Sequence, residues 1–135
     1  MGKITVICEK LDDGGYSAYL PLLPGCIATA ESLSEIKNSI KETITYHIEG
    51  MQEENLTIPE SFQREYELTY KMDIPSLFGW FSGVLTKRGI SRITGMNQSL
   101  ISQYAMGIKR PSSKQTKKIE SALHSLGKEL MEIEL

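Results

Sequence analysis

The 135-residue sequence has only two cysteines and no long apolar run. The first feature argues against a disulfide-stabilised secreted protein, and the second argues against a membrane-spanning protein. No stretch approaches the roughly 18 consecutive apolar residues of a membrane-spanning helix, and the N-terminal MGKITVICEK lacks the long apolar segment of a signal peptide. We therefore expect a cytoplasmic protein with no membrane partner. The two cysteines, Cys8 and Cys26, have small or apolar neighbours in expected strands, which predicts buried free thiols and no disulfide.

Clusters of metal-ligating or nucleophilic side chains are also missing. His47 and His124 each stand alone on an expected helix, without a Cys or a second His at ligand spacing. Asp12 and Asp13 are adjacent and point to opposite sides, whereas two-metal hydrolysis needs carboxylates that converge from separate strands. Asp-Asp-Gly-Gly is better explained as a solvent-exposed turn. The sequence thus predicts a protein that is not an enzyme and has no catalytic residue, metal or cofactor.

The net charge of −2 is the sum of two halves whose net charges have opposite signs. Residues 1–70 carry 5 basic and 12 acidic side chains, a net charge of −7, whereas residues 71–135 carry 10 basic and 5 acidic ones, a net charge of +5. Such a change of sign at the midpoint favours two small modules over one. We predict domains over residues 1–73 and 74–135, and expect contact with nucleic-acid phosphates from the second alone.

The first 30 residues have the alternation of three strands. Apolar and polar side chains alternate over residues 4–8, residues 12–15 supply turn chemistry, and residues 16–20 return as the second strand of a hairpin. After two prolines, residues 26–30 predict a short third strand.

A long amphipathic helix follows these strands. Ser32 and Glu35 have the spacing of a capping box. Residues 66–72 then alternate as a last strand, so the expected order is β-β-β-α-β. The apolar face of the helix, at steps of three or four, consists of Leu33, Ile36, Ile40, Ile44, Ile48 and Met51.

Residues 86–107 have the apolar spacing of two short helices joined by a sharp turn. Thr86 is suited to cap the first helix, whose inner face we assign to Ile90 and Ile93. Gly95 suits the left-handed residue that ends it, and Asn97 can cap the second helix.

The second of these helices leaves amides and hydroxyls outside when Ile101 and Tyr104 point inward, and such groups read base edges in a major groove. A helical hairpin within a core has the same spacing, but the basic residues downstream favour DNA. We assign base reading to Asn97, Gln98, Ser99, Ser102 and Gln103, and phosphate contacts to Lys87, Lys109, Arg110 and Lys114.

Residues 86–111 resemble, without a gap, the lambda-repressor-like (Xre-type) helix-turn-helix. The resemblance implies an all-α C-terminal domain that binds DNA. Together with the β-β-β-α-β first half, it gives an expected fold of the α+β class. The matching positions are Thr86, Ser91, Gly95, Ile101, Ser102, Tyr104, Gly107 and Pro111.

Residues 12–44 resemble the HicB family of antitoxins, and the similarity extends roughly over residues 3–72. It implies a partial RNase H-like N-terminal domain, a type II toxin–antitoxin role, a HicA-like mRNA-cleaving toxin as partner, and repression of the protein's own operon through operator DNA. The matching positions are Gly15-Tyr16, Ala18, Leu20-Pro21, Leu23-Pro24-Gly25-Cys26 and Ala30.

The acidic half complements a basic ribonuclease, because opposite fields speed encounter and exclude RNA. Aromatic and apolar anchors favour an interface at Tyr16, Tyr19, Leu22 and Leu23, although ordinary core packing explains the same residues. The alternative function is a stand-alone helix-turn-helix transcriptional regulator whose N-terminal domain senses a ligand or mediates assembly.

The last five residues, MEIEL, alternate apolar and acidic side chains as an exposed strand would. We expect Met131, Ile133 and Leu135 to pair with the same segment of a second copy, which predicts a homo-oligomer, either a dimer or a tetramer. A frayed terminus is the alternative.

Overall fold

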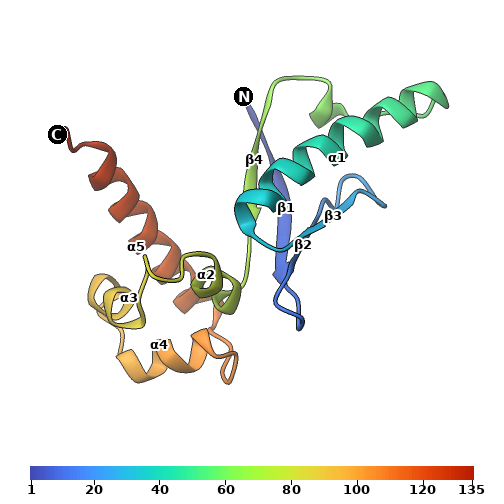
Figure 1. Ribbon diagram of the computed structural model, residues 1–135. Coiled ribbons are helices and arrows are strands. Elements are labelled where there is room, and N and C mark those ends of the chain that lie inside the picture. Colours follow the sequence, from blue (N-terminus) through green and yellow to red (C-terminus); the bar gives the residue numbers. More distant parts are fainter. The chain divides into compact units, whose positions relative to one another are not determined.

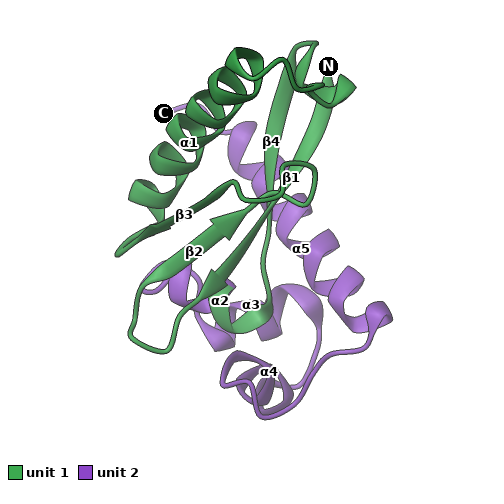
Figure 2. Ribbon diagram, turned by 90° about the vertical axis from the view of Figure 1, so that its right-hand side faces the viewer, with its two compact units in different colours: residues 1–76 green, residues 77–135 purple.

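The computed structural model describes residues 1–135 and divides into two compact units, residues 1–76 and 77–135 (Figures 1 and 2). The division expected from the charge pattern, after residue 73, lies three residues earlier. Five α-helices and a four-stranded sheet form the regular structure, so the predicted α+β class is confirmed.

The sheet of the first unit has the strand order β3-β2-β1-β4. β1 (Gly2–Lys10) pairs antiparallel with β2 (Tyr16–Tyr19), and β2 pairs antiparallel with β3 (Ile27–Ala30). β4 (Tyr66–Lys71) runs parallel to β1, which requires a crossover that a long helix supplies. The predicted hairpin and the β-β-β-α-β order are confirmed.

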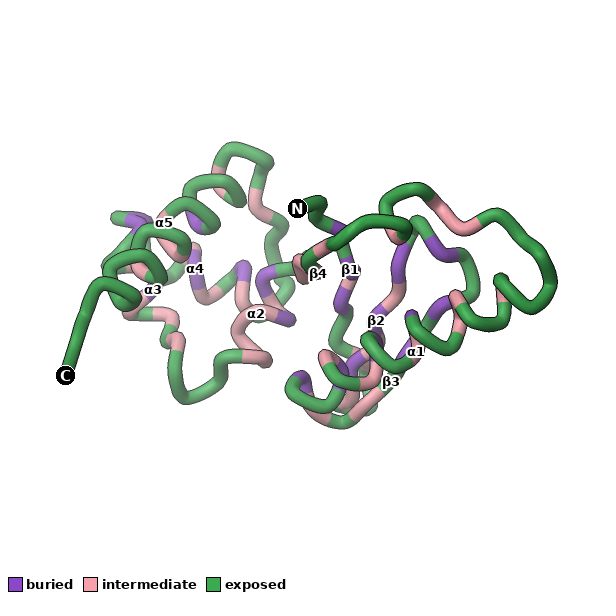
Figure 3. The backbone as a smooth tube through the Cα atoms, turned by 90° about the horizontal axis from the view of Figure 1, so that it is seen from above, coloured by how far each residue is buried: buried purple, intermediate pink, exposed green.

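That helix, α1 (Leu33–Glu53), crosses one face of the sheet (Figure 1). The Ser32 side chain accepts a hydrogen bond from the Glu35 N–H at 3.3 Å, as its predicted capping position requires. Burying an isoleucine contributes about 1.5–3 kcal/mol, so the apolar stripe of α1 attaches it to the sheet. Burial is concentrated in the first half of the helix (Figure 3), at Leu33, Ile36, Ile40 and Ile44.

The second unit is helical and contains α3 (Lys87–Thr94), α4 (Gln98–Ala105) and α5 (Ser113–Met131). Ser112 caps α5 by accepting a hydrogen bond from the Gln115 N–H at 3.2 Å. Its buried apolar residues come from these helices and the α3–α4 turn: Ile90, Met96, Ile101, Tyr104 and Ile119.

Sequence analysis does not predict α2 (Ile74–Trp80), the helix at which the two units divide. Its signal is local, because the Ser76 N–H donates to the Asp73 carboxylate at 2.8 Å, the spacing of an N-cap. Pro75 in the first turn supports the same interpretation, because the backbone N–H that proline lacks would have no hydrogen-bond acceptor within the helix at this position.

One prediction for the second unit is wrong. Ile93 is 38% exposed, and the buried position of that turn belongs to Thr94, four residues after Ile90. In the single chain α5 ends at Met131 and the following residues form no regular element. The strand expected for residues 131–135 needs the backbone groups of a second copy, so it stays a prediction.

Candidate nucleic-acid and partner interfaces

The predicted end signals of α3 and α4 are confirmed. The Thr86 hydroxyl accepts from the Gly89 N–H at 2.9 Å, and the Asn97 side chain accepts from the Ser99 N–H at 2.8 Å. Gly95 ends α3 with φ +72°, the left-handed conformation that glycine adopts at little cost. The two helices are therefore joined by a sharp turn with satisfied ends.

Two hydroxyls inside this turn hold α3 against the start of α4. The Thr94 hydroxyl donates to the Ile90 carbonyl at 2.6 Å and accepts from the Met96 N–H at 3.2 Å. The Ser91 hydroxyl donates to the Met96 carbonyl at 2.5 Å. Because Thr94 is only 7% exposed, these bonds satisfy a buried polar group and give the turn one geometry.

The outer side of α4 carries the residues assigned to base reading. Gln98, Ser99 and Gln103 are exposed, and no intramolecular hydrogen bond engages the side-chain amide of Gln98 or Gln103. Asn97 is also exposed, but its oxygen is used in the cap. Ser102 is half-buried, and its hydroxyl oxygen lies 3.7 Å from the Met106 sulfur. The two glutamines are thus best placed to contact another molecule.

The chain after α4 turns back on it and brings basic residues close to its end. Gly107 has φ +74°, and the N–H groups of Ile108 and Lys109 donate to the Gln103 carbonyl at 3.0 and 3.3 Å. Lys109 and Arg110 follow at once and are exposed. The backbone of these basic residues thereby lies close to the end of α4 that carries Gln103.

Between Asp73 and Glu120 the chain contains no acidic residue. All the basic residues of this interval are exposed except Lys87, which is half-buried at the start of α3. Sequence analysis did not assign phosphate contacts to Arg88 and Arg92, although their spacing places them on one side of α3. The eight basic residues are Lys87, Arg88, Arg92, Lys109, Arg110, Lys114, Lys117 and Lys118.

An apolar row crosses the sheet of the first unit on the face away from α1. The register pairs Tyr19 with Ile7 of β1 and with Ile27 of β3. Their neighbours Cys8 and Ala18 are 2% and 0% exposed, and alternate strand residues point to opposite faces. Ile27 is 60% exposed, while Ile7 and Tyr19 are half-buried. We call Ile7, Tyr19 and Ile27 the open-face row.

Burial removes two residues from the predicted partner surface. Tyr16 is 9% exposed and points to the same side of the sheet as Cys8, and Leu23 is 1% exposed. Both belong to the core, as the packing alternative had it. Leu22, at 47% exposed, and Tyr19 remain accessible. Sequence analysis did not include Ile7 and Ile27, because what links them to Tyr19 is the register of the three strands in the folded sheet.

The two cysteines are buried and free, as predicted. Burial raises the pKa of both thiols, and for Cys8 the nearby Lys37 ammonium lowers the pKa in part. A thiol that stays protonated is a poor nucleophile, so neither cysteine has the properties of a reactive site.

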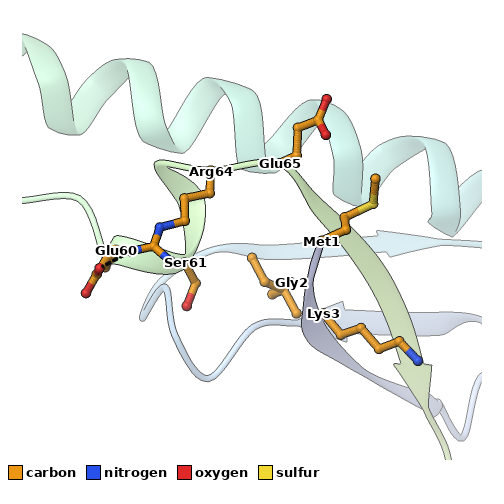
Figure 4. A pocket seen from close by; sticks show the side chains of 8 residues that line it. Met1, Gly2, Lys3, Glu60, Ser61, Arg64 and Glu65 are labelled. Carbon is orange, nitrogen blue, oxygen red and sulfur yellow. Dashed lines mark hydrogen bonds and ion pairs between the residues drawn. The ribbon is translucent and has the colours of Figure 1, made fainter.

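A hollow lies where β1 begins beside the 3-10 turn η1 (Glu60–Phe62), and Figure 4 shows its polar side chains. Arg64 and Glu60 form an ion pair of 2.7 Å there, but both are largely exposed, so the pair is worth about 0–1 kcal/mol. No group of three or more His, Cys, Asp or Glu residues in the chain could hold a metal ion. No helix is both long and apolar enough to cross a membrane.

An apolar row within an acidic unit, and a helical unit of net positive charge with no acidic residue before Glu120, are features of a protein that binds other macromolecules. A family model described as the HicB_like antitoxin of bacterial toxin-antitoxin systems matches residues 4–86, more than half of the chain. The chain therefore belongs to this family of antitoxins. Membership implies a toxin partner and points to a regulatory, non-enzymatic role.

Three relatives of known sequence each match less than half of this chain. A UPF0150 protein of Thermoplasma acidophilum is 38% identical over 63 residues, which cover 47% of this chain and 91% of that protein. A UPF0150 protein of Synechocystis is 38% identical over 56 residues, or 42% of this chain and 71% of that protein. An uncharacterized 14.9 kDa protein of Haemophilus phage HP1 is 45% identical over 56 residues, and the match spans 41% of each chain.

Proposed function

We propose that this chain is an antitoxin that neutralises a HicA-like, mRNA-cleaving toxin with its first unit and represses its own operon by sequence-specific DNA binding with its second. The observation that carries this proposal is the division of charge between the two units. Residues 1–76 have a net charge of −7 and residues 77–135 a net charge of +5. Each unit thereby suits a partner of opposite sign.

The DNA-binding part of the proposal rests on the geometry of α4. Its two free glutamines can donate to and accept from base edges, and a bidentate glutamine contact discriminates bases by about 1–3 kcal/mol. The cations that flank α4, including Lys109 and Arg110, can neutralise phosphates on either side. A helix-turn-helix related to the lambda-repressor type combines these features.

The DNA-binding test is a single substitution in α4. Gln103→Ala weakens binding to the chain's own promoter by about 1–3 kcal/mol and leaves toxin inhibition unchanged, because it removes an exposed amide only. Fluorescence anisotropy with a promoter fragment and a scrambled fragment measures it. Gln52→Ala, an exposed glutamine at the end of α1, is the matched control. Unchanged promoter affinity for Gln103→Ala would remove α4 from base reading.

The toxin-binding part rests on the open-face row. Interfaces combine an apolar centre with a polar or charged rim, and aromatic residues are enriched in that centre. Tyr19 supplies the aromatic and Ile27 the most exposed apolar surface. The acidic surroundings repel RNA and attract a basic nuclease, so this face is suited to cover a toxin's RNA-binding surface.

The toxin-binding test replaces the central aromatic. Tyr19→Ala weakens the complex with the toxin by at least about 1–2 kcal/mol, because an interfacial aromatic contributes that much or more. Inhibition of mRNA cleavage, titrated with the purified toxin, measures the effect. Tyr46→Ala is the control, since Tyr46 is 80% exposed on α1. Equal effects of both substitutions would contradict the assignment to the open face.

The remaining parts of the proposal are those expected of a member of this antitoxin family. The sheet with its single crossover helix fits a partial RNase H-like domain, and a cytoplasmic location suits a partner that cuts mRNA. Reading two half-sites requires two copies, because one short helix contacts too few bases. We assign self-association to residues 131–135, whose apolar side chains are exposed.

A further inference from the structure

The outer side of α4 ends in an apolar residue. Met106 follows the last residue of α4 with φ −86° and ψ −4°, and its N–H donates to the Ser102 carbonyl at 3.0 Å, so it continues the helical path. Residues three and four positions apart on a helix are neighbours, which places Met106 beside Gln103 and Ser102. The face assigned to base reading therefore extends one turn further and finishes with a methionine.

The side chain of Met106 lies along this face and is open to solvent. The Ser102 hydroxyl donates to the Met106 sulfur at 3.7 Å, which keeps the thioether on the outer side of the helix. Met106 is 62% exposed, whereas Ile101 and Tyr104, which point inward from α4, are 0% and 4% exposed. Met106 thus contributes little to the core of the unit and is available to another molecule.

The charge around Met106 favours a nucleic acid as that molecule. No acidic residue lies between Asp73 and Glu120, and Lys109 and Arg110 follow Met106 within four residues. In the major groove the base edges present hydrogen-bond donors and acceptors, and the apolar exception is the C5-methyl group of thymine. An apolar side chain on a face that enters this groove therefore has thymine as its counterpart.

The dimensions of α4 allow this contact. Its eight residues span about 12 Å, close to the width of the major groove, which is also about 12 Å. From Gln103 to Met106 the helix advances about 4.5 Å, and successive base pairs are about 3.4 Å apart. Methionine is unbranched and flexible, so its methyl group can adapt to the position of a neighbouring base.

We propose that Met106 reads the C5-methyl group of a thymine in the operator, one or two base pairs from the base that Gln103 contacts. This inference rests on the proposed binding of operator DNA through α4. Contact between the two methyl groups removes apolar surface from water on both sides, which changes an affinity a few-fold. Ser102 acts as the positioning residue, because its hydroxyl holds the sulfur.

Deoxyuridine tests the contact, because it pairs as thymidine does and lacks only the methyl group. With promoter fragments in which one thymidine at a time is replaced, the full chain is expected to lose affinity about three- to fivefold at one position of each half-site. Met106→Gln puts an amide in place of the thioether at similar length. This variant is expected to bind the thymidine and deoxyuridine fragments equally at those positions. Fluorescence anisotropy measures the affinities.

Ile108→Ala is the matched control. Ile108 is 69% exposed and lies beyond the turn at Gly107, so its replacement is expected to leave the loss caused by deoxyuridine unchanged. Sensitivity to the methyl group that persists in Met106→Gln, or that disappears in Ile108→Ala, would overturn the inference.

A scrambled fragment separates this result from the fate of the proposed function. If the full chain prefers the promoter to the scrambled fragment but no thymine is sensitive to loss of its methyl group, the inference alone is contradicted. Equal affinity for the promoter and the scrambled fragment would contradict the proposed DNA binding and the inference together.

Discussion

At the residue scale, one buried hydroxyl accounts for the turn between α3 and α4. Thr94 occupies a position that an aliphatic residue could fill by size, yet its hydroxyl donates to the Ile90 carbonyl within α3 and accepts from the Met96 N–H beyond the helix end. Met96 is only 7% exposed, so without the Thr94 hydroxyl its backbone N–H would be left without a hydrogen-bond acceptor. The hydroxyl therefore supports the relative placement of the two helices.

Thr94→Val is the direct test of this role. The substitution keeps the shape and leaves a buried donor unpaired, so it should destabilise the second unit by about 1–3 kcal/mol. Urea unfolding followed by the fluorescence of Trp80, the single tryptophan of the chain, measures the change. Thr45→Val removes a similar hydroxyl bond, 3.1 Å to the Lys41 carbonyl, at an exposed position and should cost less than about 0.5 kcal/mol. If both substitutions cost the same, burial of Thr94 has no special effect.

At the element scale, the end of α3 depends on a glycine with a left-handed conformation. A Cβ at Gly95 would meet no atom within 4 Å, so any cost of Gly95→Ala comes from the backbone alone. With φ at +72°, that cost is about 1–2 kcal/mol. Gly127, inside α5, has equally open space and no positive φ.

The two alanine substitutions should therefore have opposite signs. Gly95→Ala lowers the stability of the second unit, and Gly127→Ala raises it by about 0.5–1 kcal/mol, because alanine favours the helix interior. Thermal unfolding followed by circular dichroism at 222 nm separates them. A destabilising Gly127→Ala would show that α5 is not a continuous helix there.

The elements that sequence analysis predicted well are those with local signals. Ser32, Thr86 and Asn97 bond to N–H groups two or three residues away, so their chemistry is legible without the fold. The partner surface was harder to predict, because the face of β2 that α1 covers depends on packing between distant segments. Tyr16 and Tyr19 are both strand tyrosines, yet the first lies in the core and the second on the open face.

At the scale of the whole molecule, binding to DNA should depend on salt through the second unit. Each phosphate contact contributes about 0.9 to the slope of the logarithm of affinity against the logarithm of salt concentration. Arg88 and Arg92 are exposed on α3, where the first helix of a helix-turn-helix crosses the DNA backbone. They are therefore expected to contribute to this slope.

The double substitution Arg88→Ala with Arg92→Ala should reduce that slope by about 2, with a similar loss for specific and scrambled fragments. Anisotropy titrations at several salt concentrations measure it. Lys128→Ala, at an exposed position near the end of α5, is the control and should leave the slope unchanged. A loss restricted to the specific fragment would indicate that these arginines read bases.

The central claim is that one chain binds a toxin with its acidic unit while its basic unit remains free to bind operator DNA. Co-expression with the small basic protein encoded beside it, followed by size-exclusion chromatography with light scattering, tests this claim most directly. The account predicts a stable complex that does not cleave mRNA and still shifts the promoter fragment. Elution of this chain alone, with the neighbouring protein active on mRNA in its presence, would contradict it.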